Sequence, residues 1–198
     1  ILGAVDNFDE GKDIAKPDIC PFCGSKLIEE GANLFCPNKD CRPRVIAKLA
    51  NFASKEGMNI DGFSEKTAGQ LFDAFTLDKF SDLYKLTTEK LMTLEGFRER
   101  KAENLISAIA ATKKIPLANF IFALGIEGVG KKTAKDLAKE FGSVAELAKA
   151  NEERLIEIPD VGAIMAKDIS DYFLNEDNVN EINELFSVGV EPFIENEN

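Results

Sequence analysis

The chain of 198 residues contains no histidine and no tryptophan. The absence of histidine excludes the Ser-His and Cys-His pairs of many hydrolases and every zinc site that mixes cysteine with histidine. No signal-peptide pattern and no long apolar run is visible either, which argues against a secreted or membrane-spanning protein. With 44% hydrophobic residues the chain can still bury a core, which we expect to be divided among two or three small units.

Basic residues are in the minority, but their distribution matters more than the formal net charge of -11. Residues 171–198 hold eight acidic residues and no basic one. Residues 36–55 hold five basic residues against one acidic residue, and a second basic cluster consists of Lys131, Lys132 and Lys135. Any one cluster is compatible with a solvated face. Together they place the acidic residues at the C-terminal end of the chain and concentrate the basic residues near the cysteines and at residues 131–135, where an anion can bind.

All four cysteines lie within 22 residues, as the pairs Cys20-x2-Cys23 and Cys36-x4-Cys41. This spacing is typical of a structural zinc site with four thiolate ligands. The alternative is two disulfides, which a chain without a secretory signal does not favour. We predict a zinc finger at residues 17–43, whose closed site stabilises a fold and performs no chemistry.

A short phrase recurs four times, starting at Gly62, Gly96, Gly128 and Asp160. The starts are 34, 32 and 32 residues apart, and each is followed six residues later by an alanine and then by a leucine or isoleucine. A fixed period of this size indicates copies of one supersecondary unit. We predict a mostly α fold, a tandem array of four helix-hairpin-helix motifs preceded by the small zinc finger.

The turn glycines carry the functional prediction. Glycine accepts the positive φ of a tight turn, and the N–H groups of the next helix then point outward and can bind a phosphate without reading a base. A single such glycine is equally a helix cap, but four copies of the phrase at one period, each followed by the same alanine and aliphatic residue, favour phosphate binding. The candidate DNA-binding residues are Gly62, Gly96, Arg98, Gly128, Gly130, Lys131, Lys132 and Gly162, together with Arg44 after the zinc finger.

The segment from Gly125 to Thr133 resembles the phosphate-binding loop of P-loop nucleotide-binding proteins in sequence. Lys132 stands where serine or threonine must bind magnesium, and residues 117–124 before it have a helical pattern instead of the required buried strand. We therefore exclude a nucleotide-binding loop.

The remaining segments suggest how the chain is organised. Residues 1–16 begin with a strand-like run and are expected to end a sheet of a preceding domain, and residues 191–198 are expected to be a linker. Between them we predict one hairpin pair at residues 44–112 and another at residues 113–190. Predicted helix starts and caps are Thr76, Pro116, Ser143 and Asn151.

Five stretches make the chain resemble the C-terminal half of bacterial NAD-dependent DNA ligases. They are Cys20–Gly24, Met58–Gly62, Leu94–Phe97, Ala123–Gly130 with Thr133–Ala134, and Ile158–Gly162. The resemblance extends over residues 1–190 and implies the end of an oligonucleotide-binding (OB) barrel at residues 1–16, the zinc finger and the helix-hairpin-helix domain. Copies one, two and four depart from the family pattern at Ser64, Arg98 and Asp160, so copy three is expected to bind phosphate best.

The resemblance implies an enzyme that seals nicks in duplex DNA during replication and repair, by adenylation of a lysine with NAD, transfer of AMP to the 5′-phosphate and attack by the 3′-hydroxyl. The family's adenylated lysine lies in a Lys-x-Asp-Gly motif, and the nearest approach here has Asn59 in place of the lysine. We therefore predict no catalytic residue in this chain, which should be inactive alone, and assign NAD and Mg²⁺ to a catalytic domain outside it.

The partners implied are nicked double-stranded DNA and the adenylation and OB domains of the same native chain, with no membrane. The protein is expected to be a monomer in the bacterial cytoplasm, associated with the nucleoid. One alternative is a stand-alone helix-hairpin-helix module that binds DNA structures in repair or recombination. Another is a helical array that joins other proteins, which binding to nicked duplex would exclude.

Overall fold

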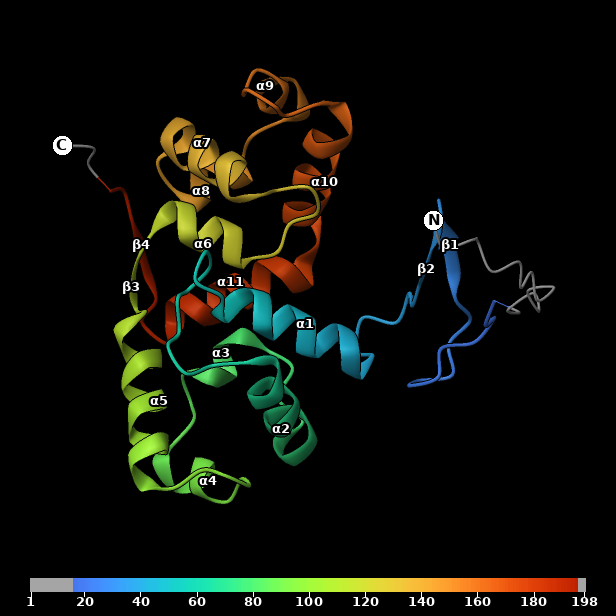
Figure 1. Cartoon of the computed structure of the whole chain (residues 1–198). Coiled ribbons are helices and arrows are strands. Elements are labelled where there is room, and N and C mark those ends of the chain that lie inside the picture. Colours follow the sequence, from blue (N-terminus) through green and yellow to red (C-terminus); the bar gives the residue numbers. More distant parts are fainter. Residues whose placement is uncertain (1–15, 196–198) are drawn as a thin grey trace, which may run out of the picture. The chain divides into compact units, whose positions relative to one another are not determined.

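The structure is a computed structural model that describes residues 16–195 (Figure 1). The chain divides between Cys41 and Arg42 into two compact units. The expected end of an oligonucleotide-binding barrel, residues 1–16, lies outside the described residues except for Lys16.

The first unit is a small antiparallel ribbon with its cysteines in the flanking loops. Strand β1 (Ile28–Glu30) pairs with β2 (Asn33–Phe35), and Ile28 stands opposite Phe35. Gly31 has a φ of 62° in the turn between the strands, a conformation that favours glycine. A bridge between Ile19 and Lys26 extends the ribbon toward the first cysteine loop.

The second unit is helical. Its helices are α1 (Arg42–Ala53), α2 (Glu65–Phe75), α3 (Phe80–Leu83), α4 (Thr88–Met92), α5 (Glu99–Ala111), α6 (Leu117–Ala123), α7 (Lys131–Phe141), α8 (Val144–Ala148), α9 (Glu152–Ile156), α10 (Ala163–Leu174) and α11 (Glu176–Ser187). Strands β3 (Lys114–Pro116) and β4 (Glu191–Phe193) form a short parallel pair. The predicted mostly α class is confirmed, and the residues directly before the glycine-rich segment at residue 125 form helix α6, as predicted, instead of a buried strand.

Polar caps fix several helix starts. The side chains of Ser143 and Asn151, both predicted as caps, accept hydrogen bonds from the backbone N–H groups of Glu146 and Arg154, the third residue of each helix. Pro116 was predicted as the first helical residue, but its ψ of 137° keeps it extended, so it is the N-cap of α6 and ends β3. The prediction for Thr76 is wrong, because this residue ends α2 with a φ of 53° and its N–H donates to Phe72 O.

One apolar core runs through the whole helical unit. Phe52 of α1 stacks on Phe80 of α3 with ring centroids 4.1 Å apart, and Phe120 of α6 stacks on Phe186 of α11 at 5.8 Å. Helix α1 also contacts α6, and α3 contacts α11. The two predicted hairpin pairs, residues 44–112 and 113–190, therefore share a core instead of forming separate units.

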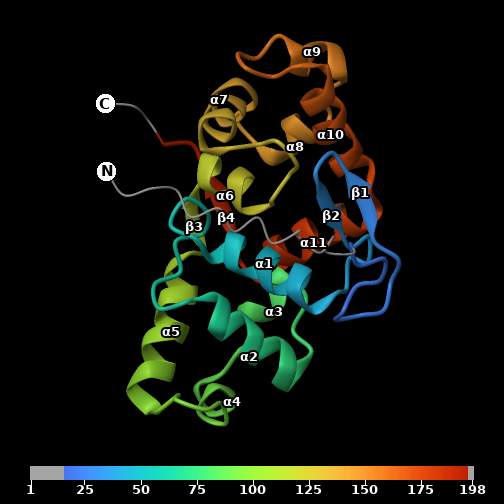
Figure 2. The same ribbon diagram turned by 45° about the vertical axis from the view of Figure 1, so that its right-hand side comes forward.

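Four charged residues, which we call the C-terminal clasp (Lys48, Lys79, Glu181 and Glu184), join α11 to the first half of the unit. Glu181 is 9% exposed, accepts a hydrogen bond from Phe80 N–H at 2.9 Å and pairs with Lys48 Nζ at 2.6 Å. Glu184 pairs with Lys79 Nζ at 2.7 Å and accepts a bond from Ser81 Oγ at 2.8 Å. Figure 2 shows α11 passing beside α1 and α3. Part of the acidic C-terminal segment is thus used inside the fold.

The expected linker at residues 191–198 begins with structure. Its first three residues form β4, and Glu191 N–H donates to Lys113 O at 2.6 Å. The chain is therefore fixed to the start of the second hairpin pair as far as Phe193.

Candidate metal centre and nucleic-acid interface

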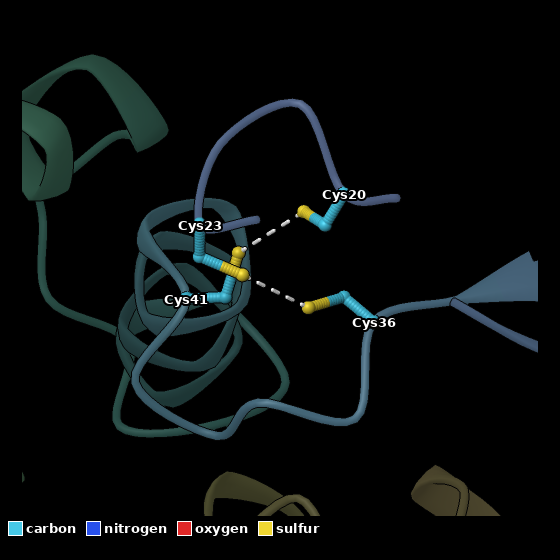
Figure 3. A group of neighbouring side chains, drawn as sticks. All are labelled: Cys20, Cys23, Cys36 and Cys41. Atoms are coloured by element: carbon cyan, nitrogen blue, oxygen red, sulfur yellow. Dashed lines mark hydrogen bonds between the residues drawn. The ribbon is translucent and has the colours of Figure 1, made fainter. Parts of the chain in front are cut away.

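The four cysteines come from two loops of the first unit and face one another (Figure 3). Their Sγ atoms all lie within 4.8 Å of one another, with Cys20 and Cys41 at 3.7 Å and Cys23 and Cys36 at 3.4 Å. All four are free, whereas a disulfide needs about 2.05 Å. Four sulfurs bound to one zinc at about 2.3 Å in a tetrahedron stand about 3.8 Å apart. The structure brings all four predicted ligands together in an arrangement compatible with a metal site such as zinc.

The environments of the thiols differ within this cluster. Hydrogen bonds to the side chain and backbone of Ser25 lower the pKa of Cys23 to about 6. Burial raises the pKa of Cys41, which is 1% exposed, to about 12. A buried thiol gives up its proton readily only when a cation takes the proton's place. Metal binding would therefore compensate the negative charge of the Cys41 thiolate, which the surrounding protein does not stabilise.

The same backbone turn occurs at all four positions of the sequence repeat. The first residue of each turn has a positive φ, 75° at Gly62, 77° at Gly96, 73° at Gly128 and 64° at Asp160. The N–H of the next residue donates to the carbonyl three positions earlier at 3.1 to 3.3 Å, in the pairs Phe63–Ile60, Phe97–Leu94, Val129–Ile126 and Val161–Ile158. The sequence period therefore corresponds to a repeated backbone geometry.

The third turn residue is the N-cap of the following helix in every copy. These N-caps are Ser64, Arg98, Gly130 and Gly162, before α2, α5, α7 and α10. Each N-cap carbonyl accepts the first helical hydrogen bond, at 2.9 to 3.0 Å, from the repeated alanine, which is 0% exposed in all four copies. The periodic alanine thus lies on the buried side of the first helical turn. The opposite side of that turn faces solvent.

The backbone conformation does not explain why two of the turn residues are glycine. Gly130 and Gly162 have φ values of -85° and -87°, which any residue adopts, and a Cβ built on either meets no atom within 4 Å. Serine and arginine occupy the same position in copies one and two. The fold does not require glycine here, and its absent Cβ leaves the N–H groups of α7 and α10 open to close approach from outside.

Cations occupy the second position of the helix after three of the turns. They are Lys66, Arg100 and Lys132, all exposed, and Ile164 holds this position in copy four. Lys66 and Arg100 were not among the residues predicted from sequence. Aligning the copies on their turns would have found them, since each stands two residues after an N-cap.

The third and fourth turns lie side by side. Lys132 of α7 forms an ion pair with Asp160 of the fourth turn, whose hydrogen bond and charge raise the pKa of Lys132. A Cβ on Gly128 would meet Met165 Cγ of α10 at 3.5 Å. Helix α2, which follows the first turn, reaches the second turn, because Gln70 Nε2 donates to Glu95 O at 2.8 Å. The structure thus groups the predicted residues as two adjacent pairs of turns.

Three predicted basic residues take different places. Lys131 is the exposed first residue of α7, and Arg98 is the exposed N-cap of α5. Arg44 is exposed in the first turn of α1 and belongs to no hairpin turn. Its neighbour Arg42 is committed within the fold, where its Nε and Nη2 each lie 2.7 Å from an oxygen of Asp73.

Two family models match the helical unit. Residues 58–111 match a "SAM-like Helix-hairpin-helix tandem", and residues 119–182 match a "Helix-hairpin-helix motif". Each match contains one of the two adjacent pairs of turns. No helix in the described part of the chain is both long and apolar enough to cross a membrane.

The chain is also similar to named proteins over its whole length. It is 47% identical over 197 residues to DNA ligase 2 of Clostridium acetobutylicum, which covers 98% of this chain and 29% of that protein. It is 46% identical over 197 residues to DNA ligase 1 of the same organism (98% and 30%) and 46% identical over 199 residues to a DNA ligase of Clostridium botulinum (100% and 30%). The chain is therefore homologous to DNA ligases, of whose length it spans about 30%, and its helical unit is built from helix-hairpin-helix motifs.

Proposed function

We propose that this chain is the duplex-binding part of a DNA ligase that seals nicks. The observation that carries the proposal is one backbone turn repeated four times, each copy leading into an exposed helix start. The N–H groups at such a start favour an anion and read no base, so they suit a protein that must bind any sequence.

The charges at the turns support phosphate as the ligand. Lys66, Arg100 and Lys132 stand at equivalent exposed positions, and Lys131 adds a fourth cation beside Gly130. Because the turns are grouped in adjacent pairs, each pair offers contacts to both strands of one duplex. Arg98 and Arg44 add positive charge on the second turn and on α1.

We assign catalysis to a part of the ligase outside this sequence. No Lys-x-Asp-Gly motif is present, so the NAD-dependent adenylation and the Mg²⁺-dependent transfers belong to the adenylation and OB domains of the native chain. The ligases that match this chain support that assignment, since the chain spans 29% or 30% of their length. The whole enzyme would act as a monomer in the bacterial cytoplasm, at the nucleoid, in replication and repair.

We also propose that the cysteine cluster holds a structural Zn²⁺. Thiolate sulfur is a preferred ligand of zinc, and Cys20, Cys23, Cys36 and Cys41 together fill a tetrahedral site. With no open coordination position the ion would supply no catalytic chemistry. It would fix the two loops of the first unit, in which Cys20 and Cys41 are the buried apolar residues among residues 16–41.

The test is binding of the chain to a labelled nicked duplex, with Gly130→Ala and Gly130→Val as variants. Both add a side chain where no atom of the protein lies within 4 Å, so the fold should survive, as circular dichroism can verify. A phosphate approaching the N–H groups of α7 would meet the new Cβ, and binding should weaken by about 1–3 kcal/mol, more for valine than for alanine and equally for every DNA sequence.

The matched control is Lys139→Ala, an exposed residue near the other end of α7, which should leave binding unchanged. If the Gly130 variants bind as tightly as the unsubstituted chain, Gly130 serves only as a helix cap. If the unsubstituted chain binds no duplex, the proposed function is wrong.

A further inference from the structure

The fourth turn differs from the other three in the residue that faces outward. Ile164 is 81% exposed, and it occupies the helix position that holds Lys66, Arg100 and Lys132 in the other copies. Scattered exposed apolar residues are common on proteins. This one replaces a cation at a position whose equivalents we assign to phosphate contacts.

The charge around the fourth turn is also unsuited to a phosphate. The turn carries the carboxylate of Asp160 where the others have glycine. The first helical turn of α10 supplies no base, since Ala163, Ile164 and Met165 precede the buried Ala166. Asp160 is paired with Lys132 of the neighbouring turn, so its charge is balanced within the protein.

The two contacts between these turns hold Ile164 beside the third turn. Lys132 reaches from α7 to Asp160, and Met165, the residue after Ile164, lies against Gly128. Any duplex held by the third turn is therefore next to the fourth turn as well. The fourth turn presents an apolar side chain to it, with the open Gly162 two residues earlier.

We propose that Ile164 is an apolar DNA contact that packs against the C–H edge of a deoxyribose, beside the phosphate bound by the third turn. The proposal rests on the proposed function and assigns the fourth turn a different chemistry from the others. Every nucleotide has the same sugar, so the contact is independent of sequence. It displaces no condensed cation from the DNA, so it is also independent of salt.

The salt dependence of binding separates this contact from a phosphate contact. Ile164→Ser should weaken binding to a labelled nicked duplex by about three- to tenfold, as expected for loss of a partly buried aliphatic side chain. The slope of log affinity against log salt should stay unchanged. Ile164→Lys should make that negative slope steeper by about one, because the variant has a cation in all four copies.

The matched control is Leu174→Ser, since Leu174 is 76% exposed at the other end of the same helix. It should bind like the unsubstituted chain. The proposal is overturned if Ile164→Ser binds unchanged, lowers the salt slope, loses affinity only on some base sequences, or weakens binding no more than Leu174→Ser. A change of oligomeric state in Ile164→Ser would assign the residue to a protein interface instead. Failure of the unsubstituted chain to bind DNA would be a failure of the proposed function itself.

Discussion

Replacing Glu181 by alanine tests whether the C-terminal clasp holds the helical unit together. The Phe80 N–H that donates to Glu181 belongs to a residue that is 0% exposed, so the variant leaves a buried donor without its partner. Such a loss costs about 1–3 kcal/mol. The ion pair with Lys48 adds little, about 0.5 kcal/mol, because Lys48 is 43% exposed and its charge is screened. We expect the free energy of unfolding to fall by about 1.5–3.5 kcal/mol in total.

Urea unfolding followed by circular dichroism at neutral pH measures this difference. Glu181→Gln keeps an acceptor for the Phe80 N–H and should lose less than Glu181→Ala. Glu103→Ala, an exposed change on α5, should alter the free energy of unfolding by less than about 0.5 kcal/mol. If Glu181→Ala is as stable as Glu103→Ala, the assignment of the acidic segment to the fold is wrong.

Three further predictions concern the metal, the acid side of stability and catalysis. Removing zinc with a chelator should unfold residues 17–43 and leave the helical circular dichroism signal of residues 58–186 largely in place, and two disulfides in a metal-free chain would contradict the site. The Lys79 ammonium and the Ser81 hydroxyl hold the pKa of Glu184 below its usual value, so its stabilisation is complete above the unfolded pKa of about 4.3 and is lost as pH falls through the lower folded pKa. Glu184→Gln should flatten the acid limb of a stability titration, and an unchanged limb would refute that origin. Incubation with labelled NAD should give no covalent adenylate, and a labelled band after denaturing electrophoresis would overturn the assignment of catalysis to another domain.

The repeat was readable from sequence because local backbone geometry demands particular residues. A positive φ favours glycine at Gly62, Gly96 and Gly128, and aspartate tolerates it at Asp160. The buried helix start demands alanine in each copy. These requirements lie within a few residues of one another, so a short phrase carries them.

Features that depend on distant contacts were not readable. Lys48 and Glu181 are separated by 133 residues, and nothing in either segment indicates the other. The parallel pairing of β3 with β4 is likewise long-range. It makes residues 191–193, which were expected to begin a linker, a strand. Lys66 and Arg100 are a different case, because exposed cations are common on helices and only their equivalent place after each N-cap distinguishes these two.

The salt dependence of duplex binding by the variant that combines Lys66→Ala, Arg100→Ala and Lys132→Ala tests the central claim most directly. Lys66 and Arg100 should each contribute about 0.9 to the steepness of log affinity against log salt, and Lys132 contributes as much only where a phosphate displaces its partner Asp160, so the slope should become shallower by about 1.8 to 2.7 relative to the unsubstituted chain. The Lys139→Ala control should keep the full slope, and the loss of affinity should be the same for every base sequence. A triple variant with an unchanged slope would contradict the account, because the equivalent positions of the repeated turns would then not face DNA.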